Sequence, residues 1–172
     1  LIYGFSESTN FDQILINSNE FNYGITFGIV FILVGLAFKI SAVPFHMWAP
    51  DVYQGSPTSV TMFFALIPKI AATCVFIRFL YVPFINMIDQ WQMIIIFISI
   101  ASMIFGAVAA IGQKNLKRLI AYSSIGHMGY SLAGIATGSI GGIQSSITYI
   151  TIYVIMNLAL FCCLFMLRRN NN

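Results

Sequence analysis

Long, nearly uninterrupted apolar runs separated by short polar stretches dominate the chain. A membrane-spanning helix needs about 20 apolar residues, and this rule predicts five spans, near 24–54, 58–83, 91–112, 117–137 and 142–167. The runs lack the alternation of a membrane barrel, and open strands would leave backbone groups unpaired in lipid. The pattern therefore predicts an all-α polytopic membrane protein, a single transmembrane helical domain over 1–172 with a polar connection at 6–22.

The first predicted span is too long to be one straight helix. At 1.5 Å per residue it would reach roughly 46 Å, well beyond a hydrocarbon core of about 30 Å. Pro44 lacks the N–H that a helix needs and disfavours α geometry at Val43, so we expect the helix to break near Ser41–Pro44. Pro68 should distort the second span, as a local bulge rather than a clean kink.

Alternation of the five spans sorts the charged residues onto two sides. Five basic residues fall on one side: Lys114, Lys117, Arg118, Arg168 and Arg169. Four acidic residues fall on the other: Glu7, Asp12, Glu20 and Asp89. The positive-inside rule makes the basic side cytoplasmic, or the matrix side in a mitochondrion, with these cations as interfacial anchors.

Composition agrees with an integral membrane protein. Hydrophobic residues make up 59% of the chain and charged residues 8%, against roughly 25% charged in soluble domains. The net charge of +3 is small and dispersed, which excludes a nucleic-acid partner. Cys74, Cys162 and Cys163 lack metal-ligand spacing, and no phosphate loop, haem or iron–sulfur motif is readable, so we predict no metal and no cofactor in this chain.

Two lysines, Lys39 and Lys69, lie within adjacent membrane-length runs. An ammonium at such depth costs about 3 kcal/mol on insertion scales and marks a functional site by default. Burial penalises the charged form, so such an amine exchanges protons more readily than one in water. The alternative is that each lysine reaches an interface or neutralises a structural acid. No acid of this chain lies at matching depth, so a carboxylate partner must come from elsewhere.

Histidines provide further candidates for proton transfer. His127 lies mid-span, and Ser123, His127 and Tyr130 follow the i, i+4, i+7 spacing of one helical face that could order water. One alternative is that His127 is a hydrogen-bonded core residue. Another is that the segment is built for close helix packing through its glycines. His46 follows the expected break beside Trp48, either as a relay or as part of an interfacial half-turn. Asp51 is better explained as a surface cap or as a partner for a loop than as a catalytic acid.

Two long motifs carry a family resemblance. The stretch FKISAVPFHMWAPDVYQGSP, followed later by KNLKRLIAYSSIGHMGYSLAG, resembles the antiporter-like membrane subunits of respiratory complex I. Among them the chain is most similar to the NADH dehydrogenase subunit 2 family. The likeness runs from about residue 24 to 167. It implies an antiporter-like bundle built from inverted five-helix repeats with broken helices, which carries protons while quinone is reduced elsewhere.

The resemblance also implies roles for residues and partners. Lys39 would be the switchable proton carrier, Lys69 and His127 would relay protons along a hydrated axis, and His46 matches the histidine after the break. NADH, FMN, iron–sulfur clusters and ubiquinone are expected in other subunits. The expected partners are other complex I membrane-arm subunits and a separate chain that supplies missing helices and an acid for Lys39. The expected location is the mitochondrial inner membrane or the bacterial plasma membrane.

The family's wider membership leaves two other functions open. The chain could belong to a multi-subunit Mrp-type cation/proton antiporter, driven by an ion gradient rather than by redox chemistry. It could also be a structural helix block without transport of its own, whose interior around Lys39 would be dry. The family pattern includes helices before and after this region, so the chain resembles a fragment or one part of a divided subunit.

Overall fold

Helices form all the regular structure in the residues that the computed structural model describes, 1–17 and 23–170. They are α1 (Ile2–Ser6), α2 (Phe11–Asn17), α3 (Tyr23–Ile40), α4 (Trp48–Gly55), α5 (Thr58–Tyr81), the 3-10 turn η1 (Ile85–Met87), α6 (Ile88–Ile111), α7 (Leu116–Ala136) and α8 (Ile140–Asn170). The predicted spans correspond to α3 with α4, then α5, α6, α7 and α8. The all-α fold class is confirmed.

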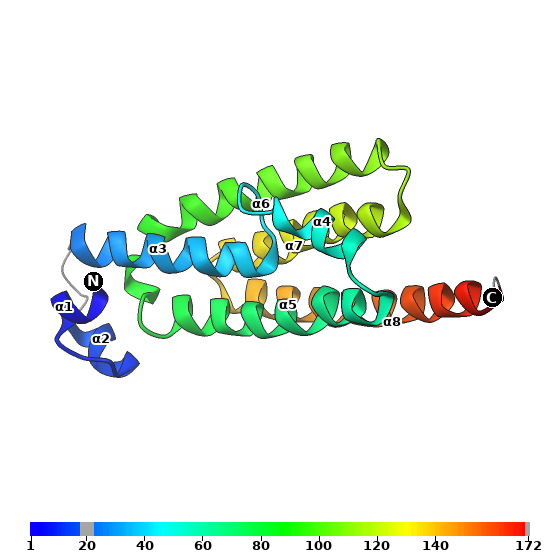
Figure 1. Cartoon of the computed structure of the whole chain (residues 1–172). Helices are drawn as coiled ribbons and strands as arrows, with labels where there is room; N and C mark the ends of the chain where they lie inside the picture. Colours follow the sequence, from blue (N-terminus) through cyan, green and yellow to red (C-terminus); the bar gives the residue numbers. More distant parts are fainter. Residues whose placement is uncertain (18–22, 171–172) are drawn as a thin grey trace.

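The long helices lie side by side along one axis, with successive spans running in opposite directions (Figure 1). Within the described residues, four segments are long and apolar enough to cross a membrane: Tyr23–Ile40, Thr58–Tyr81, Ile85–Ile111 and Ile140–Leu167. Helix α7 has 21 residues, which is also membrane length, but its first turn and one face are polar. The chain is a multi-pass membrane protein.

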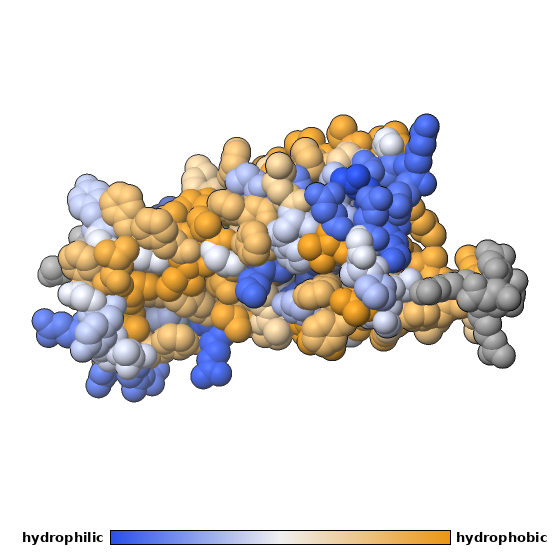
Figure 2. All heavy atoms as spheres, viewed as in Figure 1, coloured by the Kyte–Doolittle hydropathy of each residue, from blue (hydrophilic) through white to orange (hydrophobic). Residues whose placement is uncertain are grey.

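The surface agrees with this orientation in a bilayer. Figure 2 shows apolar side chains over most of the length of the bundle and hydrophilic ones gathered towards its ends. The loop between α6 and α7, which carries Lys114, lies at the same end as the C-terminus, as the alternation predicts (Figure 1). Glu20 and the side chains of Arg168 and Arg169 lie outside the described part of the chain.

The helix break occurs where Pro44 predicts it. Helix α3 ends at Ile40, and Ser41 adopts a left-handed conformation with φ of 63°. The Ser41 N–H donates to the Phe38 carbonyl at 3.1 Å, and the Ala42 N–H donates to the Ala37 carbonyl at 2.9 Å. This pair of bonds is a Schellman motif, which satisfies the last carbonyls of a helix. A non-glycine residue in this conformation costs roughly 1–2 kcal/mol, so the break is held by its surroundings.

Two side chains hold the segment after the break. The Val43 N–H donates to Ser102 Oγ of α6 at 2.9 Å, and the Trp48 indole N–H donates back to the Phe38 carbonyl at 2.9 Å. Backbone groups inside a membrane need protein partners because no water is present. These bonds supply such partners and fix where α4 begins.

Helix α5 runs through Pro68 without interruption, since residues on both sides of the proline are α-helical. The expected bulge is therefore not seen. The polar connection at 6–22 contains the short helix α2, which the pattern did not predict. Asn10 precedes this helix, and its side-chain oxygen accepts a hydrogen bond from the Asp12 N–H in the first turn. Residues 18–22 of that connection lie outside the described residues.

Helices α6 and α7 pack closely through glycines. A Cβ added at Gly106 would lie 2.6 Å from the Gly126 nitrogen, and one at Gly129 would lie 2.8 Å from Met103 Cγ and 2.9 Å from the Ser99 carbonyl oxygen. The hydroxyl of Ser99 donates to the Gly129 carbonyl at 2.7 Å. The close-packing explanation of these glycines is thus confirmed at Gly129, and small residues let the two backbones approach.

Alanine substitutions on α7 test this packing. Gly129→Ala should lower the free energy of unfolding by about 1–3 kcal/mol, because the added methyl group overpacks the contact with α6. Gly126→Ala is the matched control, since a Cβ there meets nothing within 4 Å. It should be neutral or stabilising, because alanine favours a helix over glycine by roughly 0.5–1 kcal/mol. Thermal unfolding in detergent measures both, and equal losses would contradict the packing explanation.

Candidate functional site: a buried lysine where four helices meet

Lys69 lies in the middle of α5 with 1% of its surface exposed. Its Nζ donates a hydrogen bond of 2.6 Å to Ser124 Oγ on α7, and Ser124 Oγ donates at 2.9 Å to the Ala121 carbonyl of its own helix. The hydroxyl of Thr73 donates to the Lys69 carbonyl at 2.8 Å. The predicted depth of Lys69 is confirmed, and its amine is held between two helices by a hydroxyl group.

No carboxylate of the described residues lies within ion-pair distance of Lys69. The ion pair in this part of the chain is Arg118 with Asp51, at 2.7 Å between Nη2 and Oδ1. It lies at the start of α7, where Lys117 Nζ also donates to the Ser56 carbonyl at 2.6 Å. Asp51 therefore pairs with a residue of helix α7, and is neither a surface cap nor a loop partner as we expected. Both cations tie α4 to α7.

His127 lies half-buried one turn after Ser124 on α7. Its Nδ1 is 2.7 Å from the Tyr149 hydroxyl on α8, and its ring centroid is 5.4 Å from that of Tyr153. Lys69 and Ser124 are bonded to each other, and His127 lies one turn further along α7. These three residues define a polar cluster inside the bundle.

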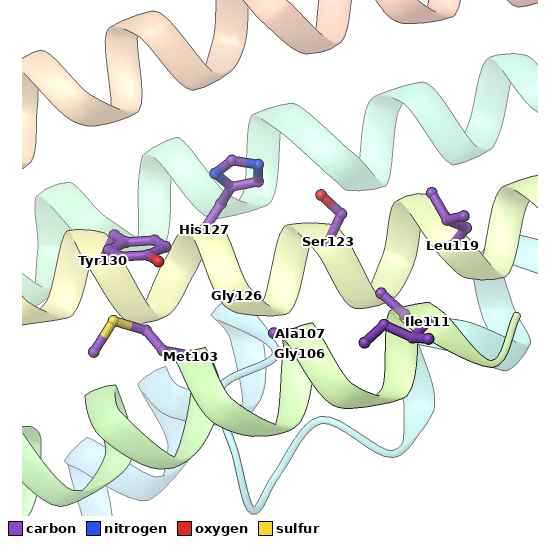
Figure 3. Close-up of a pocket in the computed structure, with 10 residues that line it drawn as sticks. Met103, Gly106, Ala107, Ile111, Leu119, Ser123, Gly126, His127 and Tyr130 are labelled. Atoms are coloured by element: carbon purple, nitrogen blue, oxygen red, sulfur yellow. The ribbon is translucent and has the colours of Figure 1, made fainter.

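A groove between α6 and α7 reaches this cluster from outside. It has a volume of about 420 Å³, and Ser123, His127 and Tyr130 line it, as their helical spacing predicts. Figure 3 shows Ser123 and His127 projecting from the same side of α7, with Met103 coming from α6. Ser124 is turned away, towards Lys69. The polar run on α7 therefore serves two faces, one towards the groove and one towards the buried amine.

Lys39 differs from its expected buried position. It is the penultimate residue of α3, and its side chain is exposed in this chain. The buried residues of α3 follow an i, i+4 stripe that includes Leu33 and Ala37, and Lys39 lies off that stripe. The break at Ser41 also places Lys39 in the last turn of a helix, where a cation interacts favourably with the helix dipole.

His46 lies inside the break and apart from the Lys69 cluster. It is 7% exposed, its ring centroid is 4.3 Å from that of Phe105, and among described residues its Nδ1 has no hydrogen-bond partner. It is therefore buried within the described part of the chain, in the turn between α3 and α4. No contact of the described residues joins His46 to Lys69 or His127.

Sequence reasoning missed three tyrosines of the site. Tyr53 of α4 is fully buried and its ring centroid lies 5.8 Å from Lys69 Nζ. Tyr149 and Tyr153 of α8 contact His127, and the Tyr153 hydroxyl donates to the Ala65 carbonyl at 3.2 Å. Tyrosines in membrane helices favour the interfaces. Tyr149 and Tyr153 lie one turn apart and well inside the last span. That spacing was the signal in the sequence that could have identified the face of α8 that contacts His127.

Metal and redox sites have no support among the residues described. No group of three or more His, Cys, Asp or Glu side chains lies together there. Cys74, Cys162 and Cys163 are free and exposed on the outer face of the bundle. The polar groups of the cluster are the Lys69 amine, the His127 imidazole and neighbouring hydroxyl groups.

A broken membrane helix, α3 with α4, that packs against a helix with a buried lysine, α5, indicates the class of antiporter-like membrane proteins, and the solved structures agree. The Mrp complex from Dietzia sp. DQ12-45-1b superposes with a TM-score of 0.84 at 25% identity, over 94% of this chain and 30% of that one. Respiratory complex I from Thermus thermophilus gives 0.71 at 33% identity, over 92% of this chain and 34% of that one.

The chain belongs to the NADH:quinone oxidoreductase/Mrp antiporter transmembrane family, whose model matches residues 1–172. It is 75% identical over 171 residues to NADH-quinone oxidoreductase subunit N of Pelagibacter ubique, covering 99% of this chain and 36% of the relative. Subunit N of Parvibaculum lavamentivorans is 55% identical, with 98% and 35% covered. The chain thus spans about a third of the length of these relatives. They are bacterial, which favours a plasma membrane and gives no support to the mitochondrial location.

The bond between Lys69 and Ser124 can be tested by stability. Ser124→Ala should lower the free energy of unfolding by about 1.5–3 kcal/mol, because a buried charged group loses its hydrogen-bond acceptor. The neighbouring Ser123→Ala removes a half-buried hydroxyl at the groove and should cost much less. Thermal unfolding in detergent measures the difference.

A double-mutant cycle isolates the pair. In a Lys69→Met background, Ser124→Ala should lose most of its effect, because the interaction is already absent. An effect of Ser124→Ala that is unchanged in that background would show that the serine stabilises the bundle through something other than Lys69.

Proposed function

We propose that this chain is part of the proton-translocating membrane subunit N of a bacterial NADH:quinone oxidoreductase. The identity of 75% to a subunit N supports this assignment, as does the superposition on respiratory complex I. The single observation that supports proton translocation most strongly is Lys69, an amine with 1% exposure whose hydrogen-bond partner in the described chain is a hydroxyl. A charge kept in such a place needs a function.

The groups around Lys69 suit the transfer of protons. A serine hydroxyl both accepts and donates hydrogen bonds, so Ser124 can hold the amine in either protonation state. An imidazole can take a proton at one nitrogen and release one at the other, and His127 bonds Tyr149 through Nδ1. In this proposal protons pass between Lys69 and His127 through Ser124 or through water entering from the groove between α6 and α7.

Lys39 has a different role in the proposal. It lies beside the helix break and faces outwards, with no carboxylate of the described chain within ion-pair distance. Its partner would be a carboxylate outside the described residues, and its charge would switch as that partner approaches and withdraws. Lys39 would then hand protons on to the cluster around Lys69, and His46 in the break is a possible relay between them.

Electron transfer would take place elsewhere in the assembly. NADH, FMN, iron–sulfur clusters and ubiquinone would bind other subunits, and the partners of this chain would be the neighbouring membrane-arm subunits. The chain would contribute to the enzyme NADH:ubiquinone reductase by moving protons while those subunits transfer electrons.

A cation/proton antiporter is the second candidate, favoured by the higher TM-score of the Mrp complex, 0.84 against 0.71. Purification of the complex that contains this chain separates the two. Co-purifying flavin and iron–sulfur clusters support the oxidoreductase, and proton movement driven by a cation gradient without them supports the antiporter. A dry interior, with no exchange of the Lys69 amine protons with solvent, would favour a purely structural helix block.

Replacement of Lys69 tests the relay directly. Lys69→Met in the assembled complex should lower NADH-driven proton translocation by about tenfold or more, the scale on which positioned acids and bases act. Lys114→Met, in the exposed loop between α6 and α7, is the matched control and should leave translocation unchanged. Proton uptake and NADH oxidation in membrane vesicles measure both, and an unaffected Lys69→Met would overturn the relay.

Replacement of Lys39 tests the carrier. Lys39→Met and Lys39→Arg should both diminish pumping, the second because a guanidinium stays protonated. An arginine that preserves full pumping would show that Lys39 acts through a fixed charge and not through release of a proton. The same vesicle assay, normalised to the amount of assembled complex, gives the answer.

A further inference from the structure

Tyr53 of α4 carries a polar group whose bonding the fold leaves incomplete. The side chain is fully buried, with 0% of its surface exposed, and among described residues its hydroxyl has no hydrogen-bond partner. A buried hydroxyl without a partner costs free energy, whereas phenylalanine would fill the same space without that cost. Packing alone therefore does not explain a tyrosine here.

The neighbours of this hydroxyl are the groups of the proton site. The ring centroid of Tyr53 lies 5.8 Å from Lys69 Nζ. Tyr153 of α8 packs against His127, but its hydroxyl donates to the Ala65 carbonyl at 3.2 Å. Of these two phenols, Tyr53 is the one whose hydroxyl has no hydrogen-bond partner among the described residues.

The bonding needs of Lys69 and Tyr53 are complementary. A protonated lysine offers three donors and a phenol oxygen can accept. Ser124 Oγ takes one of the three donors, at 2.6 Å. The protonated amine thus has two further donors, and the Tyr53 oxygen beside it has no hydrogen-bond partner among the described residues.

We propose that Tyr53 is a positioning residue that offers the Lys69 amine a second hydrogen-bond partner. The amine alternates between Ser124 on α7 and the phenol of Tyr53 on α4. The phenol accepts a bond from the protonated amine and donates one to the neutral amine. This inference rests on the proposed function and deepens it, because it names the contact through which the segment after the helix break reaches the relay.

The position of α4 makes this contact possible. Helix α4 follows the break directly. It is tied to α7 by the Asp51–Arg118 pair in its first turn and by the bond from Lys117 to the carbonyl of Ser56, the residue that caps its end. In this proposal, a movement at the break that displaces α4 also changes the position of Tyr53 relative to Lys69. The phenol would couple the state of the broken helix to the orientation of the buried amine.

Conservative removal of the hydroxyl tests the proposal. In the assembled complex, Tyr53→Phe should lower proton translocation about fivefold at unchanged assembly, the effect of one lost hydrogen bond. Tyr81→Phe is the matched control, because its phenol on α5 donates to the Ile135 carbonyl at 2.7 Å and it is not among the contacts of Lys69. Translocation is measured per assembled complex, so reduced assembly does not obscure the result.

Rescue distinguishes a hydrogen-bonding role from a packing role. Tyr53→His restores a group that accepts and donates but fits the space less well than phenylalanine. The proposal predicts more translocation from Tyr53→His than from Tyr53→Phe. Equal or greater translocation from Tyr53→Phe would overturn it.

Parallel measurement of Lys69→Met separates this inference from the proposed function. If Lys69→Met impairs translocation and Tyr53→Phe does not, the positioning role is overturned and the relay stands. If Lys69→Met has no effect, the relay itself fails, and the role of Tyr53 fails with it.

Discussion

The burial of one amine organises the centre of this bundle. Lys69 is shielded by elements from four parts of the chain, and its nitrogen is bound by a serine on α7. An amine inside a membrane protein is tolerated only where polar partners replace water. Helices α4, α5, α7 and α8 therefore meet at this point with hydroxyl groups and an imidazole rather than with aliphatic side chains. Their arrangement places a titratable amine in an otherwise apolar interior.

The helix break also places polar groups inside the membrane that need hydrogen-bond partners from the protein. A broken helix exposes carbonyl and amide groups that lipid cannot satisfy. Here a Schellman turn at Ser41, the hydroxyl of Ser102 and the indole of Trp48 satisfy them from within the protein. The break thereby changes the direction of the chain without opening the backbone to lipid. It also carries α4 across the bundle, so that a residue far from Lys69 in sequence lies against it.

Close packing and polar access coexist on α7. Glycines let α7 approach α6 closely, while Ser123 and His127 line a groove that begins beside the same contact. One turn of this helix presents Ser124 to the buried amine and its neighbour to the groove. A helix with two polar faces suits a path that leads from an interior site to the edge of the bundle. The glycines allow the close approach, because a larger side chain would push the two helices apart.

The sequence determined the helices, the break and the depth of Lys69, because apolar length, proline chemistry and charge in a membrane are local constraints. The helical spacing of Ser123, His127 and Tyr130 also predicted one face correctly. Which face of α3 would be covered was not local, and so Lys39 was expected inside but lies exposed. Only the tertiary structure brought Tyr53 from α4 and the tyrosines of α8 to the amine, because contacts between distant segments depend on how whole helices pack and not on the residues beside them.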